Sequence, residues 1–269
     1  MLRALRLLRQ TAYIALGPLD YLLRVINGKR DLPPLHLRRH VGPLRSFEAS
    51  AAEFQTYLRL LARLTPDESI LDLGCGCGSM ALTLKEFLDG GRYLGVDIHQ
   101  PSINWCRRNI QSRYSNFEFL AINPNELSSE SQQRFSLPYP DGAFDVILVK
   151  SVFTHLRATE ANIYLSEIAR LLSKRGRCLA TFFLLNDQQA ELKKRGLNAI
   201  AFDFGEEPSA QYAYQNSPQS AVAFCEGFVM DCLRKHKLNL AQPVIYGSWS
   251  GLTEGLSFQD LLLIERSKA

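Results

Sequence analysis

The chain has 269 residues, of which 46% are hydrophobic and 22% are charged, so it is long enough to bury one large core. Its net charge of +4 is small and indicates no particular class of partner, and no apolar run approaches the ~18 residues that a membrane-spanning helix needs. The six cysteines form no Cys-x-x-Cys pair, and the start of the chain does not resemble a secretory signal, so we expect reduced thiols and a cytoplasmic protein.

Residues 1–45 hold nine Lys or Arg residues against only Asp20 and Asp31, which gives this arm a net charge of +7. Apolar residues recur between its arginines with a helical spacing, at Leu2, Leu5, Leu8 and Ala12. This pattern predicts an amphipathic helix that either packs on the protein's own domain, the alternative we favour, or makes peripheral contact with a membrane surface. No nucleic-acid partner is expected, because no aromatic residue stands among the arginines before Tyr13.

From residue 46 to residue 185 the apolar pattern alternates between the periods of helices and strands. Strands are predicted over residues 69–74, 92–98, 117–122, 144–150 and 176–185. Helices are predicted over residues 46–64, 80–88, 101–111 and 159–172. This alternation is typical of βαβ units, so the sequence predicts an α/β fold with a doubly wound, mostly parallel sheet and helices on both faces.

The alternation stops after residue 185. Residues 186–217 are polar and irregular and are interpreted as an insertion, and a helix is predicted over residues 219–237. Two apolar runs, 243–249 and 257–265, then flank a Gly- and Ser-rich stretch, which predicts an antiparallel hairpin. The expected organisation is therefore a basic arm over residues 1–45 and one domain over residues 46–269 that carries the insertion.

The first predicted strand leads into "ILDLGCGCGSMALTL", in which three glycines stand at alternate positions: Gly74, Gly76 and Gly78. Glycine reaches positive φ and lets a ligand lie against the main chain, and ligands bind at the carboxyl ends of parallel strands. A dinucleotide fingerprint does not fit, because its third glycine would fall on Ser79, and a P-loop would need a lysine. A zinc site lacks two further ligands, so no metal is expected and Cys75 and Cys77 are interpreted as small loop side chains.

Asp97 ends the second predicted strand, 23 residues after Gly74. A carboxylate at this position accepts hydrogen bonds from both hydroxyls of a ribose. The alternative is a cap for the helix that begins at Pro101, but Asp97 stands too early in the chain for an ideal cap. We therefore interpret Asp97 as a ligand-binding residue.

With "LDLGCGCG" followed by "GVDI", the sequence resembles the class I S-adenosylmethionine (SAM)-dependent methyltransferases. The stretch "LPYPDGAFDVILVKSVFTHL" resembles the segment around their fourth strand, and "YGSWSG" with "SFQDLLLIE" resembles their C-terminal antiparallel hairpin. The resemblance implies a Rossmann-like seven-stranded sheet and SAM as the cofactor.

The resemblance also implies roles for individual residues. The glycine turn would lie under the methionine part of SAM, with Asp72 meeting the ammonium group and Asp97 holding the ribose. Ile98 would cover the adenine, and Asn123 stands where the family often has an acid for the adenine amino group. The implied cofactor-binding residues are Asp72, Gly74, Cys75, Gly76, Gly78, Asp97, Ile98, Asn123, Pro124, Lys150 and Ser151.

His155 follows the fourth predicted strand and is the candidate for a general base; the alternative is a structural histidine. Aromatic side chains are expected to contact the methyl acceptor: Phe153, Tyr212, Tyr214 and Trp249. These features favour O-methylation of a small or medium-sized organic acceptor, such as a sugar, lipid-linked or natural-product hydroxyl. The alternatives are an NAD-type oxidoreductase and a SAM-binding scaffold without turnover, in the cytoplasm or peripherally at a membrane surface.

Overall fold

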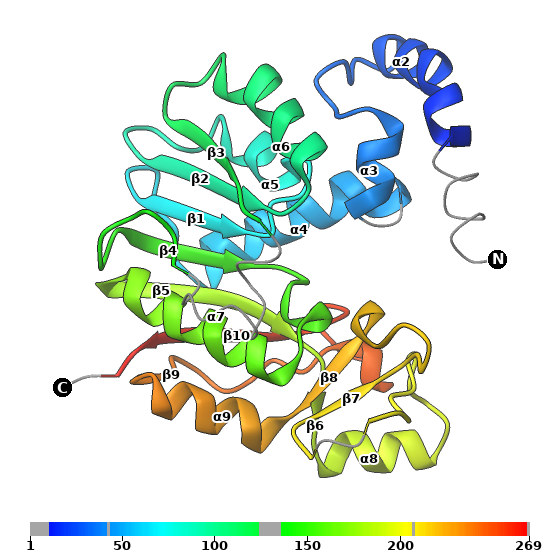
Figure 1. Ribbon diagram of the computed structural model, residues 1–269, viewed down its shortest axis with the longest axis vertical. Coiled ribbons are helices and arrows are strands. Elements are labelled where there is room, and N and C mark those ends of the chain that lie inside the picture. Colours follow the sequence, from blue (N-terminus) through cyan, green and yellow to red (C-terminus); the bar gives the residue numbers. More distant parts are fainter. Residues whose placement is uncertain (1–10, 42–43, 124–135, 206–207, 268–269) are drawn as a thin grey trace.

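A seven-stranded sheet runs through the protein, with strand order β3-β2-β1-β4-β5-β10-β9 (Figure 1). The computed structural model describes residues 11–41, 44–123, 136–205 and 208–267. The strands are β1 (Ser69–Leu73), β2 (Arg92–Asp97), β3 (Phe117–Ala121), β4 (Phe144–Val149), β5 (Leu172–Phe182), β9 (Leu238–Leu240) and β10 (Asp260–Arg266). Strands β1 to β5 are mutually parallel and β10 is antiparallel to both of its neighbours, which confirms the predicted doubly wound, mostly parallel sheet.

Helices cover both faces of this sheet, because successive side chains of each buried strand point to opposite sides. One face packs against α4 (Phe47–Leu60), α5 (Ser79–Leu84) and α6 (Gln100–Cys106). The other face packs against α7 (Ala158–Leu171) and α9 (Glu226–Lys235), as Figure 1 shows. Each face carries its own apolar core, so the sheet is shielded from water on both sides.

The antiparallel C-terminal pairing is confirmed, but one of its strands lies elsewhere than predicted. Strand β9 comes directly after α9, and residues 243–249 contribute only an isolated bridge between Ile245 and Leu261. The Gly247 amide donates to the Asp260 carboxylate at 2.7 Å instead of to a neighbouring strand, and residues Ser248–Ser250 form a 3-10 helix. A side-chain acceptor therefore replaces the ladder partner at Gly247, while the Ser248 and Trp249 amides still donate to backbone carbonyls.

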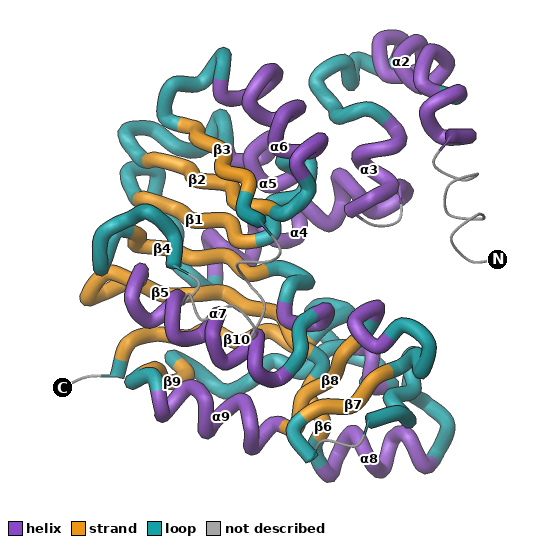
Figure 2. Tube along the Cα trace, in the orientation of Figure 1, coloured by secondary structure: helices purple, strands orange, loops and turns teal. Residues whose placement is uncertain are grey.

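A second, three-stranded sheet lies beside the large one, with order β6-β8-β7 (Figure 2). It comprises β6 (Leu184–Leu185), β7 (Ala210–Tyr212) and β8 (Val222–Cys225), next to α8 (Asp187–Lys194). The helix predicted from residue 219 is wrong as far as residue 225, because the short apolar run of β8 has no periodicity that separates a buried strand from a helix. The predicted domain limits stay predictions.

The arm contains α2 (Gly17–Ile26) and α3 (Leu35–Val41), and residues 11–15 are helical as well. Leu2, Leu5 and Leu8, which carried part of the amphipathic pattern, lie outside the described residues. Leu37 of α3 joins the core on the α4 side of the sheet. The arm therefore attaches to the domain through α3, while α2 lies further out (Figure 1).

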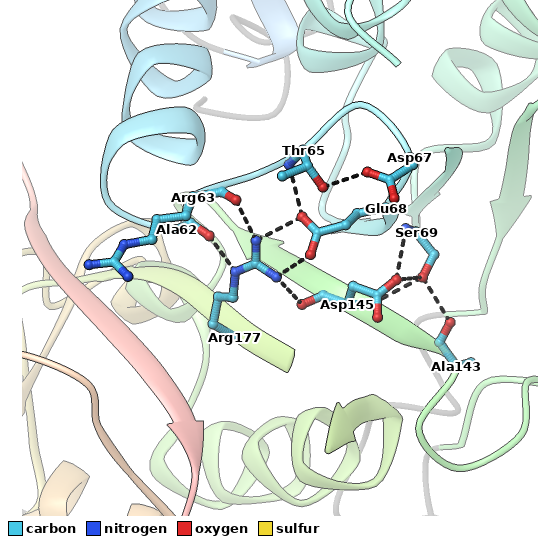
Figure 3. Close-up of polar contacts among 9 residues, drawn as sticks. All are labelled: Ala62, Arg63, Thr65, Asp67, Glu68, Ser69, Ala143, Asp145 and Arg177. Carbon is cyan, nitrogen blue, oxygen red and sulfur yellow. Dashed lines mark hydrogen bonds and ion pairs between the residues drawn. The ribbon is translucent and has the colours of Figure 1, made fainter. Parts of the chain in front are cut away.

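Arg177 of β5 organises the amino-terminal edge of the sheet (Figure 3). Its guanidinium binds both carboxylate oxygens of Glu68, at 2.5 and 2.7 Å, and donates to the carbonyls of Ala62 and Arg63. Asp145 accepts hydrogen bonds from the Ser69 hydroxyl at 2.7 Å and the Ser69 amide at 3.0 Å. These contacts tie the segment between α4 and β1 to the sheet and leave the opposite edge for ligands.

Candidate active site

Three polar side chains meet at the carboxyl edge of the sheet. Strand β1 pairs with β2 on one side and with β4 on the other, so the chain order reverses here. Ligands bind at such switch points in open α/β sheets. Asp72 pairs with Gly95 and with Leu148, and alternation along β2 and β4 then puts Asp97 and Lys150 on the same face as Asp72.

The turn between β1 and α5 has a backbone that only glycine fits. Gly74, Gly76 and Gly78 have φ angles of 83°, 54° and 80°, in the left-handed region. A Cβ atom on Gly74 would lie 2.3 Å from a methyl of Val152, and one on Gly76 would lie 2.8 Å from a methyl of Val41. We call this turn the glycine cradle; methyl groups of Val152 and Val41 pack directly on its main chain.

Asp97 is held against this turn by two backbone donors. Its Oδ2 accepts from the Gly76 amide at 2.7 Å and its Oδ1 accepts from the His99 amide at 2.7 Å. Helix α6 has His99 at its N-cap and no side-chain cap, so the structure does not support the alternative that Asp97 caps this helix. Each carboxylate oxygen keeps a lone pair for a further donor, such as a ribose hydroxyl.

Asp72 is only 2% exposed and accepts from the Tyr93 hydroxyl at 2.5 Å. Burial raises the pKa of Asp72 to about 6, although Tyr93 and the charge of Lys150 oppose the rise. Burial also raises the pKa of Tyr93, and the neighbouring Asp72 charge adds to this. The Asp72 carboxylate therefore stands in a place where a positive ligand would relieve the cost of its charge.

Lys150 follows β4 and its ammonium turns toward α4. Its Nζ donates to the Ser50 hydroxyl at 2.8 Å and lies 4.4 Å from the ring centre of Phe54. Burial lowers the pKa of Lys150, and the charges of Asp72 and Glu53 oppose this effect. The positive charge of Lys150 thus offsets the negative charge of Asp72 from within the fold.

Ser151 directly follows Lys150 and has a φ of 57°, which is uncommon for a residue with a side chain. Its amide donates to the Thr181 hydroxyl at 2.8 Å, and its own hydroxyl donates to Gln259 at 2.9 Å. These contacts hold the strained residue in place, a feature that clusters at functional sites.

His155 ends a 3-10 helix, η4 (Phe153–His155), and is exposed. Its Nδ1 lies 2.9 Å from the Gln219 carbonyl oxygen. A carbonyl only accepts, so Nδ1 carries the hydrogen and Nε2 of the neutral ring is left as an acceptor. This tautomer suits a general base that takes a proton at Nε2.

The expected acceptor residues divide into two groups. Phe153 and Trp249 are fully buried: Phe153 stacks on Phe182 at 4.2 Å, and Trp249 donates to Asp260 at 2.9 Å. The structure therefore gives these two core roles and does not support their expected contact with an acceptor. Tyr212 is half-buried on β7 and Tyr214 is exposed after it, so both present surface to solvent.

The remaining predicted cofactor-binding residues differ in their exposure to solvent. Ile98 is half exposed and Asn123 is exposed, while Pro124 lies outside the described residues. Cys75 and Cys77 are buried in the core, so Cys75 offers a ligand its backbone only. Within the described ranges 11–41, 44–123, 136–205 and 208–267, no group of three His, Cys, Asp or Glu side chains is placed to hold a metal ion.

Four residues of this site escaped the sequence reasoning: Tyr93, Ser50, Val41 and Val152. Tyr93 alternates with Gly95 and Asp97 along β2, so the period of two could have placed it beside Asp72. Ser50 lies 100 residues from Lys150 in the chain, and no local pattern signals such a contact. No local pattern signals the contacts of Val41 and Val152 with the glycine turn either.

Comparison with known proteins identifies the family to which the chain belongs. Residues 64–220 match the family model described as "Methyltransferase domain". A demethylmenaquinone methyltransferase of Thermus thermophilus is 32% identical over 114 residues, or 42% of this chain and 46% of that protein. A fatty-acid O-methyltransferase of Mycolicibacterium smegmatis is 31% identical over 157 residues, or 57% of this chain and 50% of that protein. The chain thus spans about half the length of these two relatives.

A solved structure shares the fold over nearly the whole chain. It is the 1,6-didemethyltoxoflavin-N1-methyltransferase of Burkholderia thailandensis, with bound 1,6-didemethyltoxoflavin and S-adenosylhomocysteine. The TM-score is 0.53 at 18% identity, and the match covers 96% of this chain and 90% of that one.

Proposed function

Because the chain belongs to the class I SAM-dependent methyltransferases, we propose that it transfers the methyl group of SAM to a hydroxyl of a small or medium-sized organic acceptor. One observation supports SAM as the methyl donor most directly. A cradle of three left-handed glycines faces a carboxylate, Asp97, that the Gly76 amide holds at 2.7 Å.

The residues of the cradle fit SAM. The positive φ angles of Gly74, Gly76 and Gly78 leave main chain without side chains on the turn that would lie under the methionine part. Asp97 would accept from the ribose hydroxyls, and the buried Asp72 carboxylate would meet the ammonium group. When bound, SAM supplies a methyl group activated by its positively charged sulfur.

The chain's own part in the reaction is to orient the acceptor and to take its proton. His155 Nε2 would accept the proton of the hydroxyl, because Nδ1 is already committed to the Gln219 carbonyl. The exposed ring can then release this proton to solvent. Tyr212 and Tyr214 stand on the inserted segment and supply aromatic surface for the organic part of the acceptor.

Lipid-linked hydroxyls are the acceptors that we favour. The two relatives named above are called after demethylmenaquinone and a fatty acid, both of which are lipophilic. Such an acceptor resides in membranes, so we also propose peripheral contact of the arm with a membrane surface. Among the described residues, no helix combines the length and the apolar character needed to span a bilayer.

The function is tested by incubating the full chain with isotope-labelled SAM and a panel of lipophilic and water-soluble hydroxyl compounds. Mass spectrometry should show a labelled methyl ether on a lipophilic compound. His155→Gln should lower kcat by roughly 10²- to 10⁴-fold and leave the SAM dissociation constant unchanged. SAM binding without any product would favour the scaffold alternative, and binding of NADH in place of SAM would favour an oxidoreductase.

A further inference from the structure

Helix α2 turns its polar side toward the protein. Between residues 11 and 30 only four residues are partly covered: Tyr13, Gly17, Asp20 and Arg24. Their spacing of four, three and four residues places them on one helix face. The inward face of this helix therefore carries the charged pair Asp20 and Arg24, together with Tyr13 and Gly17.

The charged pair fixes this orientation. Asp20 accepts from Arg24 at 2.9 Å, from the Leu35 amide at 3.2 Å and from the guanidinium of Arg38. Arg24 donates in addition to the carbonyls of Arg30 and Leu32. The side chains of Asp20, Arg24 and Arg38 are only 10–12% exposed. Groups so well shielded and paired are costly to separate, so the helix is held with its polar side inward.

The apolar side of the helix faces outward. Large apolar side chains between residues 14 and 26 are 43–69% exposed: Ile14, Leu16, Leu19, Tyr21, Leu22, Leu23, Val25 and Ile26. A surface helix of a globular protein normally shows the reverse arrangement. A contiguous exposed apolar surface of this kind marks an interaction site with a protein or a membrane.

The charged residues that line the space between α2 and the domain are mainly basic. A cavity of about 280 Å³ lies beside α2, and the charged residues in its wall are Arg24, Arg30, Lys85, Arg113 and a single acid, Asp31. Lys85 and Arg113 share Asp31, at 3.4 and 3.1 Å, so positive charge exceeds negative charge in the wall. The whole arm has a net charge of +7. A partner for this surface must combine an apolar interior with anionic groups at its border.

We infer that α2 lies in the surface of an anionic lipid bilayer, with its outward apolar face among the acyl chains and lipid phosphates at the basic cavity. Interfacial helices bind in this way, through buried apolar area and through attraction to anionic headgroups. This inference rests on the membrane contact proposed above and adds two details. It names the class of lipid, and it names the docking face, which is the outward apolar side of α2.

The test is co-sedimentation of the full chain with vesicles of phosphatidylcholine alone and of phosphatidylcholine mixed with phosphatidylglycerol. The chain should bind the mixed vesicles more tightly. Leu22→Glu should weaken this binding roughly tenfold to a hundredfold, because an apolar group that enters the bilayer is replaced by a charge. Arg30→Gln should weaken binding to the mixed vesicles about fivefold and leave binding to neutral vesicles unchanged.

Leu60→Glu is the matched control, because Leu60 is 72% exposed on α4, outside the docking face, and its replacement should leave vesicle binding unchanged. Equal binding by the wild type and Leu22→Glu, or no binding at all, would overturn the inference. A dimer in light scattering that Leu22→Glu dissolves would overturn it in favour of a second copy of the chain.

SAM binding and methylation of a detergent-dispersed acceptor, measured on the same variants, separate this inference from the proposed function. Vesicle binding without methylation would contradict the proposed function and support the docking face. Methylation without vesicle binding would contradict the docking face and support the proposed function.

Discussion

At the scale of the residue, the ionisation of Asp72 links cofactor binding to pH. Its pKa is raised to about 6 by burial, so the carboxylate gains a proton as the pH falls through this value. A protonated Asp72 no longer attracts the SAM ammonium. We expect SAM affinity, measured by calorimetry, to fall as the pH drops below about 6, and Asp72→Asn to bind weakly with little dependence on pH.

The raised pKa of Asp72 affects the stability of the ligand-free protein in the opposite direction: stability falls, rather than rises, with increasing pH. The folded state holds this proton more tightly than the unfolded state, whose pKa is near 3.8. The contribution of Asp72 to the free energy of unfolding therefore declines as the pH rises from about 4 to about 6. An affinity that rises as the pH falls would contradict the role given to Asp72.

Asp97 is the residue whose loss should affect cofactor binding most directly. Asp97→Ala removes the acceptor for the ribose hydroxyls and also frees the Gly76 amide from its 2.7 Å hydrogen bond. Hydrogen bonds to charged groups contribute about 1.5–3 kcal/mol, so the SAM dissociation constant should rise roughly tenfold to a hundredfold. Asp89→Ala, at an exposed turn, is the control and should leave SAM binding unchanged. An unaltered constant for Asp97→Ala would remove this residue from the site.

At the scale of the element, the two edges of the sheet have different tasks. Arg177→Leu removes the bidentate partner of Glu68 and the donor to two loop carbonyls at the amino-terminal edge. Loss of one partner of a partly buried pair should lower the free energy of unfolding by about 2–3 kcal/mol, measured by urea denaturation. Arg175→Leu, at an exposed position of the same strand, should cost far less. A large change of SAM affinity in folded Arg177→Leu would show that the edges are not independent.

The elements that the sequence predicted correctly share a strong periodic pattern. The parallel strands β1 to β5 and helix α7 emerged from their apolar spacing, and Asp72 and Asp97 were located because they end such strands. Strand β8 was predicted to be helix because a run of four apolar residues, three of them buried, has no period. Residues 243–249 form no regular strand because the Gly247 amide binds a buried carboxylate, Asp260, which no local pattern reveals.

Within the candidate site, the limit of prediction was distance along the chain. The glycine turn and Asp97 stand in one βαβ unit, whereas the hydrogen bond between Lys150 and Ser50 joins segments 100 residues apart. The sequence also did not reveal side-chain burial, since Phe153 and Trp249 were expected to contact the acceptor but are fully buried.

At the scale of the whole molecule, a ligand that binds only the folded chain must stabilise all of it. SAM at a hundred times its dissociation constant should add about 2.7 kcal/mol to the free energy of unfolding. For a chain of this size the Tm should then rise by roughly 5–10 °C in a scanning calorimeter. An equal rise with NADH, or no rise with saturating SAM, would contradict the assignment of the cofactor.

The contact between the arm and the glycine turn has a thermodynamic consequence. Val41, the last residue of α3, packs so closely on Gly76 that a Cβ there would lie 2.8 Å from its methyl group. The arm that carries the docking helix thus touches the turn proposed to hold SAM. Two ligands that act on one contact share one coupling free energy, and the coupling is reciprocal. Whatever factor a lipid surface imposes on the affinity for SAM, SAM imposes the same factor on the affinity for that surface.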